Sequence, residues 1–280
     1  MLSSSKHEPS ETLRYQLIFC DIDDTLLSDA LEISQEDVNA ISCYIRSGGI
    51  LVLTTGRNFI ASEAVYKKLN LSTPIIINLG TVFDPIENKI LHTQMLPKHQ
   101  LIELCKYLEE LDVYFQLFSG NQIFVENYTI YTHQYIQRCN VNIKTTDVKL
   151  STFVLKKDLS YQKLMIECDE SLVDTLLNKI KNKFGNIFSV TKSKKWIIEI
   201  CPKEHTKGDA VRYLSEHFGI PKEKTMCIGD SYNDLTMFEQ TGFSVAVSNS
   251  YPDVKEKADY VTASNNQSGV GKAINFFAYY

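Results

Sequence analysis

The sequence predicts an α/β protein, with a Rossmann-like doubly wound parallel sheet as its core and an inserted α+β cap domain. Three observations support this fold class. Short apolar runs alternate with helical patterns over the first 80 residues, which is typical of strand-helix-strand units in a parallel sheet. The same alternation returns after about residue 196 and continues to the end. Between these segments, hairpin signals beside amphipathic helices indicate a separate α+β layer.

The first part of the core is predicted over residues 15–80. Leu17–Cys20 is an apolar run without alternation, which is typical of a strand buried on both faces. A helix over 33–47 has apolar residues at helical spacing, and Ser34 is a suitable cap for its start. The elements that follow are a strand over 50–53, a helix over 59–69 and a strand over 74–78.

The inserted α+β cap is assigned to residues 81–195, where the elements are longer and more polar. Ser119-Gly120-Asn121 separates two strand-like runs and predicts a hairpin turn. Pro97 lies near the start of an amphipathic helix, a position where proline is favoured. The predicted order is a strand over 89–96, a helix over 97–111, strands over 113–118 and 122–125, a helix over 128–138, a strand over 163–167, a helix over 171–183 and a strand over 187–190.

The core is predicted to resume over residues 196–280. Its elements are a strand over 196–200, a helix over 206–218, a strand over 224–228, a helix over 232–240, a strand over 243–247, a helix over 252–257, a strand over 259–262 and a helix over 269–277. An insertion between the two halves of such a sheet is expected over the carboxyl edge of its strands, where ligands bind. Residues 1–14 are polar and predict a flexible tail.

The composition excludes several classes of protein. The chain of 280 residues is 44% hydrophobic and 22% charged, which is ordinary for a globular protein. Its net charge of -5 argues against a nucleic-acid binder. Its apolar runs are too short to cross a membrane. The seven cysteines show no C-x-x-C spacing, so neither a disulfide framework nor a zinc site is indicated, and we expect a cytoplasmic protein.

Carboxylates follow the first predicted strand at Asp21, Asp23 and Asp24. In an extended segment the first two point the same way, and like charges held so close require a cation or a shared proton. Mg²⁺ is suitable because it prefers oxygen ligands and takes one or two carboxylates. The alternative is a solvated acidic turn, which is common after strands.

A second polar stretch, Thr54-Thr55-Gly56-Arg57, ends the next strand. A hydroxyl group, free amides and a helix N-terminus together predict an anion site here. The alternative is an ordinary turn in which threonine caps the following helix. Arg57 is compatible with two positions, facing a substrate or exposed at the start of the helix.

Two further stretches lie beyond the insertion. Lys207 is in the first turn of a predicted helix, where the helix dipole opposes a cation, so pairing with phosphate or carboxylate explains it better than solvent exposure. Asp230 ends another buried strand after Gly229. Asp234 lies one helical turn later, so both carboxylates can face one point. The alternative is a helix capped by Asp230, with Asp234 on its surface.

These four stretches resemble the four signatures of the haloacid dehalogenase (HAD) superfamily, whose members are mostly phosphatases. The segments are Asp21-Ile22-Asp23-Asp24-Thr25-Leu26, Thr54-Thr55-Gly56-Arg57, Lys207-Gly208 and Gly229-Asp230-Ser231-Tyr232-Asn233-Asp234. The last form, together with the large insertion, is typical of the Cof-like subgroup with a type IIB α/β cap. Two positions depart from the subgroup: Asn78-Leu79-Gly80 replaces Asn-Gly, and Ser248 replaces a glycine.

The resemblance implies Mg²⁺-dependent hydrolysis of small phosphate monoesters, such as sugar phosphates, through an aspartyl-phosphate. It implies Asp21 as nucleophile, Asp23 as general acid and base with a raised pKa, and Lys207 as a further catalytic residue. The implied metal ligands are Asp21, Asp23 through its backbone carbonyl, Asp230 and Asp234. The implied phosphate- and substrate-binding residues are Thr55, Gly56, Arg57, Lys207 and Asn233.

Two other functions compete with hydrolysis. A sugar phosphomutase would share the aspartyl-phosphate but return the phosphoryl group to a sugar. A non-enzymatic regulator that binds a phosphorylated metabolite predicts loss of Asp21 or Asp23, and both are present. A dinucleotide-binding protein is disfavoured because no G-x-G-x-x-G follows the first strand.

Overall fold

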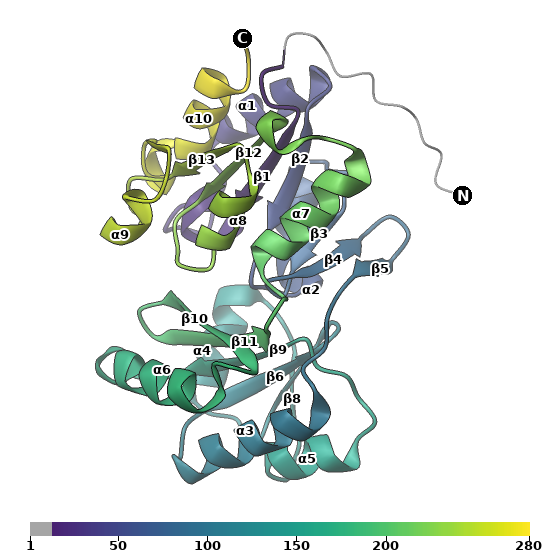
Figure 1. Ribbon diagram of the computed structural model, residues 1–280, viewed down its shortest axis with the longest axis vertical. Coiled ribbons are helices and arrows are strands. Elements are labelled where there is room, and N and C mark those ends of the chain that lie inside the picture. Colours follow the sequence, from purple (N-terminus) through teal and green to yellow (C-terminus); the bar gives the residue numbers. More distant parts are fainter. Residues whose placement is uncertain (1–12) are drawn as a thin grey trace.

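The computed structural model describes residues 13–280, which form two sheets with helices packed on them (Figure 1). The predicted tail over 1–14 lies outside the described residues except for its last two. Leu13 pairs with Tyr279, and the Arg14 amide donates to the Ala278 carbonyl at 2.9 Å. These two residues therefore join the C-terminal segment.

The first sheet has the strand order β14-β13-β12-β1-β2-β3-β4-β5. The strands from β14 to β3 are parallel, whereas β4 and β5 are antiparallel additions at one edge. Its strands are β1 (Leu17–Asp21), β2 (Ile50–Thr54), β3 (Ile75–Ile77), β4 (Thr81–Asp84), β5 (Lys89–His92), β12 (Thr225–Gly229), β13 (Phe243–Ala246) and β14 (Tyr260–Val261). The predicted doubly wound parallel core is confirmed.

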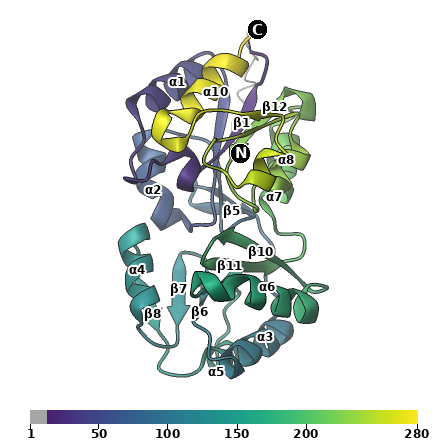
Figure 2. The same ribbon diagram turned by 90° about the vertical axis from the view of Figure 1, so that its left-hand side faces the viewer.

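Helices cover both faces of this sheet, as Figure 2 shows. Ile18 and Cys20 of β1 pack on the face covered by α1 (Gln35–Arg46), α2 (Phe59–Lys68) and α10 (Gly269–Phe277). Leu17 and Phe19 pack on the face covered by α7 (Lys207–Phe218), α8 (Leu235–Gln240) and α9 (Pro252–Lys255). Both faces of β1 are therefore buried, which explains its continuous apolar sequence.

The second sheet has the order β10-β11-β9-β6-β7-β8. Its strands are β6 (Phe115–Ser119), β7 (Gln122–Val125), β8 (Ile143–Thr145), β9 (Lys163–Glu167), β10 (Phe188–Lys194) and β11 (Ile197–Pro202). One face packs on α3 (Lys98–Glu110), α5 (Leu150–Lys156) and α6 (Glu170–Phe184). The other face packs on α4 (Ile130–Cys139) and on Ala61 of α2, so it is turned toward the first sheet.

The strand pairing moves both predicted boundaries of the insertion. β4 and β5 were assigned to the cap but belong to the first sheet, because the turn after β3 reverses the chain and β4 pairs back on β3. β11 was assigned to the core but pairs with β9 and β10. We therefore propose that the cap comprises residues 93–203.

Other predicted elements agree with the structure to within a few residues, although β4, β8 and α5 were not predicted. Their sequences are short and lack a clear period, so local pattern gives little signal for them. No helix within residues 13–280 is both long enough and apolar enough to cross a membrane.

Candidate active site

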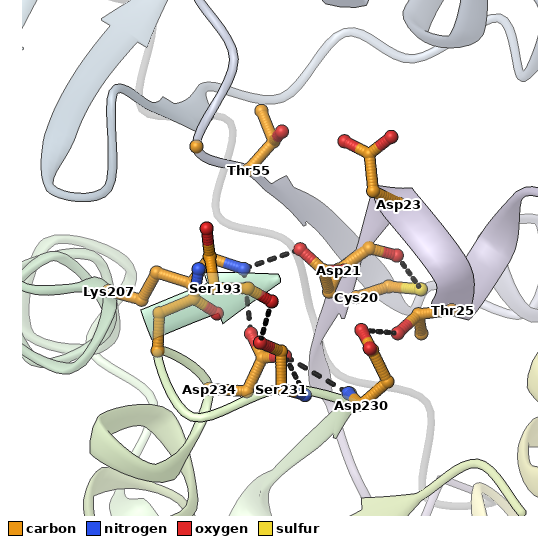
Figure 3. A network of polar contacts seen from close by, with 12 residues as sticks. Cys20, Asp21, Asp23, Thr25, Thr55, Ser193, Lys207, Asp230, Ser231 and Asp234 are labelled. Carbon is orange, nitrogen blue, oxygen red and sulfur yellow. Dashed lines mark hydrogen bonds and ion pairs between the residues drawn. The ribbon is translucent and has the colours of Figure 1, made fainter. Parts of the chain in front are cut away.

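The predicted site residues meet at one edge of the first sheet. Asp21 ends β1, Thr54 ends β2 and Gly229 ends β12, and these three strands are adjacent and parallel. Their carboxyl ends therefore lie side by side, facing the second sheet (Figure 1). Lys207, the first residue of α7, completes the group (Figure 3).

Lys207 connects two of the carboxylates. Its Nζ contacts Asp21 Oδ1 and lies 2.6 Å from Asp234 Oδ1, and only 1% of its side chain is exposed. Thr206 caps α7 through a reciprocal hydrogen-bond pair with Asp209, which fixes where the helix begins and so where Lys207 points. Burial raises the pKa of Asp21 to about 8, against the opposing effect of the Lys207 ammonium.

Asp234 and Asp230 form the other half of the cluster. Asp234 Oδ2 accepts hydrogen bonds from the backbone amides of Asp230 and Ser231, both at 3.0 Å. Asp230 Oδ1 accepts one from the Thr25 hydroxyl at 3.0 Å, and burial raises the Asp230 pKa well above its usual value. Gly229 is required here, because a Cβ at that position would lie 2.6 Å from Asp234 Cγ.

The carboxylates suit a hard divalent cation. Asp21, Asp230 and Asp234 each offer an oxygen within 4.8 Å of the others. Oxygen donors of this kind are those that Mg²⁺ prefers. Both oxygens of Asp234 already accept hydrogen bonds, which favours a role in orienting Lys207 and Asp230.

Asp23 is directed away from this cluster, as Figure 3 shows. Its two oxygens accept from Arg57, from Nε at 2.8 Å and from Nη2 at 2.5 Å. Burial alone would raise the pKa of Asp23, but the guanidinium outweighs it and lowers that pKa below the usual value. The prediction of a raised pKa at Asp23 is therefore wrong for this arrangement, as is an exposed Arg57, which is 8% exposed.

The turn after β2 is less open than its sequence suggests. The Thr55 amide donates to the Ile76 carbonyl at 2.8 Å, and the Arg57 amide donates to Thr55 Oγ1 at 3.0 Å. Two of the amides expected to be free for an anion are thus already bonded. Gly56 lets the second domain approach, because a Cβ there would lie 2.8 Å from Glu199 Oε1.

Asn78 and Leu79 support that turn from behind. Their amides donate to the carbonyls of Arg57 and Thr55 at 2.8 and 3.1 Å. Both residues have positive φ, 47° and 72°, which bends the backbone into this position. The Asn78 side chain is buried and has no partner within residues 13–280, so the described contacts of Asn78 at the site are made by its backbone.

Side chains of the cap form the opposite wall of a pocket, and none of them was predicted from the sequence. The pocket holds about 550 Å³ of empty space when its open mouth is included. The cap residues that line it include Tyr135, Arg138, Lys163, Lys194, Ile197 and Glu199. A charge inside an otherwise apolar strand, as at Lys163 and Glu199, was the available signal.

Several contacts connect the cap side of the pocket with the core. Lys163 Nζ donates to the Gly56 carbonyl and lies 2.9 Å from Glu199 Oε1. Asn233 Nδ2, expected to bind phosphate, donates to Glu199 Oε2 at 3.4 Å. Lys194 pairs with Asp24 at 2.9 Å, and Ser231 Oγ donates to the Ser193 carbonyl at 2.7 Å. The pocket is therefore covered by the second domain.

Comparison with known proteins gives consistent matches over nearly the whole chain. The sequence profile of haloacid dehalogenase-like hydrolases matches residues 18–274. YxeH of Bacillus subtilis is 30% identical over 270 residues, covering 93% of this chain and 97% of the relative. The 5-amino-6-(5-phospho-D-ribitylamino)uracil phosphatase YwtE of Bacillus subtilis is 28% identical, covering 92% and 96%.

Solved structures agree with this result. The crystal structure of TM0651 from Thermotoga maritima superposes with a TM-score of 0.80 at 31% identity, covering 95% of this chain and 98% of that one. The HAD subclass IIB sugar phosphatase BT4131 superposes with a TM-score of 0.81 at 23% identity, covering 94% and 98%. The second similarity concerns the fold, including the type of cap.

Proposed function

Because the chain belongs to the haloacid dehalogenase-like hydrolases and is a phosphatase, we propose that it hydrolyses small phosphorylated metabolites, chiefly sugar phosphates, through an aspartyl-phosphate with Mg²⁺. The observation that carries this proposal is the buried cluster of Asp21, Lys207 and Asp230 at the sheet edge, beneath a covered pocket. A carboxylate nucleophile, a fixed cation and an oxygen-rich metal site are what phosphoryl transfer requires.

The proposed reaction has two steps. Asp21 attacks phosphorus while the bond to the leaving alkoxide breaks, and Asp23 gives that alkoxide a proton. Water then attacks the aspartyl-phosphate after giving a proton to Asp23, which releases phosphate and restores Asp21. The contact with Arg57 favours ionised Asp23, the form that accepts the proton from water. The proton that Asp23 gives in the first step therefore requires its carboxyl group to turn away from Arg57.

The remaining residues position and neutralise charge. Lys207 holds the Asp21 carboxylate and would contact the oxygens of the phosphoryl group, as Thr55 would from the adjacent turn. Bound Mg²⁺ would stabilise negative charge on the same oxygens. Its ligands would be the Asp21 and Asp230 carboxylates and the Asp23 backbone carbonyl, with Asp234 in support.

The test is phosphate release from a panel of phosphomonoesters with and without Mg²⁺. Asp21→Asn should lower kcat about a thousandfold or more, because it removes the nucleophile. Asp37→Asn is a matched control, since Asp37 is a buried carboxylate that accepts from the Gly271 amide and does not line the pocket. Transfer to a sugar without free phosphate would indicate a phosphomutase, and binding without turnover would indicate a regulator. Either result would contradict the proposal.

We also propose a cytoplasmic location. All seven cysteines carry free thiols, and six of them are buried. Free thiols are typical of proteins from a reducing compartment. Fractionation of the native cell, with the protein detected by antibody, would test this location.

A further inference from the structure

The wall of the pocket contributed by the second domain is electrically balanced. Lys163 pairs with Glu199, Lys194 with Asp24, and Arg138 with Glu167. No unpaired charge remains among these residues to attract a second ionic group of a substrate. A leaving group bound against this wall is therefore expected to be uncharged, since each cation already has its counter-ion.

The paired cations differ in how much hydrogen-bonding capacity they retain. Arg57 uses Nε, Nη1 and Nη2, on Asp23 and on the Ala61 carbonyl. Lys163 is 1% exposed and is held by Gly56, Glu199 and the face of Phe118, 4.3 Å from its ring centroid. Among residues 13–280, Lys194 has one ion-pair partner, Asp24, which directly follows Asp23 and so keeps Lys194 beside the reacting groups. Arg138 is different. Its guanidinium makes one side-chain hydrogen bond within residues 13–280, from Nη2 to Glu167 Oε1.

Arg138 is also placed to use its remaining donors. Its side chain is 21% exposed and lines the pocket, whereas that of Glu167 is fully buried and fixes the guanidinium from behind. The ring of Tyr135, one helical turn earlier, lies 5.3 Å from Arg138 Cζ and limits its movement. A guanidinium has five N–H donors, and only one of those of Arg138 has a partner within residues 13–280.

Arg138 lies farther along the pocket than the reacting groups. Arg57 contacts Asp23 at one end and Ala61 at the other, and Ala61 packs in one cluster with Tyr135 and Cys139 of α4. Figure 2 shows α4 next to the end of α2. Glu167, which holds Arg138, lies four residues along β9 from Lys163, whose Nζ contacts Gly56. At the rise of a strand this separates them by about 13 Å, so Arg138 is held away from the turn that carries Thr55.

We propose that Arg138, oriented by Glu167, is the specificity-determining residue of the cap, and that it binds a hydroxyl or carbonyl oxygen at the far end of an uncharged, polyhydroxylated leaving group. This assignment rests on the proposed phosphatase function. It predicts that phosphate esters of five- and six-carbon polyols or sugars are preferred over shorter esters and over esters with an additional acidic group.

The test compares kcat/KM for ribitol 5-phosphate and glucose 6-phosphate with that for glycerol phosphate, the shortest ester of the set. 6-Phosphogluconate and fructose 1,6-bisphosphate add a carboxylate or a second phosphate. In the wild type, a long neutral ester should exceed the other esters. Arg138→Gln should lower the ratio of long to short esters about 10- to 100-fold, mainly through KM, because a charge-assisted hydrogen bond is lost. Arg138→Lys should restore part of it.

Two controls separate specificity from folding. Arg46→Gln removes an exposed arginine whose partner is Cys43 Sγ within α1, and it should leave the ratio unchanged. Arg138→Gln combined with Glu167→Gln avoids a buried unpaired carboxylate and should show the same loss of ratio with a Tm near that of the wild type.

Each outcome is decisive. If Arg138→Gln left the ratio unchanged, or if the wild type preferred the acidic esters, the assignment would be wrong although the phosphatase proposal would stand. If all esters lost activity equally, with a lower Tm also in the double variant, Arg138 would be structural. If the wild type hydrolysed no ester in the panel, the proposed function would fail, and the assignment with it.

Discussion

Asp21 and Asp23 are two residues apart and yet have opposite electrostatic surroundings. Burial raises the pKa of Asp21, although Lys207 opposes the effect. The positively charged guanidinium of Arg57 lowers the pKa of Asp23. The backbone directs the two side chains differently because β1 ends at Asp21 and Ile22, between the two aspartates, begins a helical turn. Two carboxylates of one motif can thus have different tasks.

A strained leucine provides a prediction at the same scale. Leu31 has φ of 60° and is 50% exposed, whereas Leu79 has φ of 72° and is 4% exposed. Left-handed backbone costs a leucine about 1–2 kcal/mol, so Leu31→Gly should stabilise the fold by about 0.5–1 kcal/mol after the entropy of glycine is subtracted. Leu79→Gly should instead destabilise it by about 2 kcal/mol through lost burial. Urea denaturation measures both, and equal shifts of the same sign would contradict the explanation.

His205 predicts a pH dependence of stability. It is 1% exposed, and burial together with the nearby His92 lowers its pKa to about 4. Between pH 6.5 and 4 the unfolded chain takes up a proton that the folded chain does not, so stability falls as the pH falls. The loss approaches about 3 kcal/mol at pH 4 and is absent above pH 7. The unfolding free energy of His205→Asn, measured against wild type from pH 7 to pH 4, should fall less steeply. Parallel curves would rule out this contribution.

At the scale of elements, helix starts determine where site residues point. α7 and α1 both begin with a side-chain cap: Thr206 accepts from the Asp209 amide at 3.2 Å, and Ser34 accepts from the Asp37 amide at 3.0 Å. Only the first of these helices begins with a site residue, Lys207. The same capping interaction therefore supports stability in one helix and, in the other, both stability and the site.

Removing each helix-capping side chain separates the effect on stability from the effect on the site. Thr206→Ala and Ser34→Ala should each cost about 1 kcal/mol of stability, because an amide at the helix start loses its partner. Thr206→Ala should in addition lower kcat several-fold, since Lys207 loses its fixed position, whereas Ser34→Ala should leave kcat near that of wild type. Thermal unfolding and phosphate release measure the two quantities. A similar kcat in both variants would show that the Thr206 side chain does not position Lys207.

Elements with a strong local pattern could be predicted from the sequence, and those defined by their partners could not. β1 and β12 are apolar runs ending in carboxylates, so both the strands and the Asp21 and Asp230 positions followed from local chemistry. β4 is recognised only by its pairing with β3. The cap wall depends on side chains that meet across distant strands, such as Lys163 and Glu199, and no local period reports such a contact.

At the scale of the whole molecule, a buried lysine of the cap contacts the core. Lys163 pairs with Glu199, which also belongs to the cap, and donates across the boundary to the Gly56 carbonyl of the core turn that carries Thr55. Its cation is removed from water at the point where the domains meet, so the position of the cap and the shape of the phosphate turn depend on each other.

Lys163→Met should destabilise the protein by about 3 kcal/mol, because Glu199 would remain buried without a counter-ion. Lys192→Met is the control, since Lys192 pairs with the exposed Asp174 on the same domain and should change stability by less than about 0.5 kcal/mol. Guanidinium denaturation measures both variants. A Lys163→Met protein as stable as the control would show that the buried Lys163–Glu199 pair contributes little.

The two chain segments that connect the domains lie side by side. The outgoing segment after β5 and the returning segment before α7 are joined by a hydrogen bond from the Gln94 amide to His205 Nδ1 at 3.3 Å. The insertion therefore starts and finishes at almost one point of the sheet edge. An inserted domain whose ends are adjacent can be exchanged by recombination without changing the strands of the core sheet. Substrate range can then diversify while the catalytic residues of the core are retained.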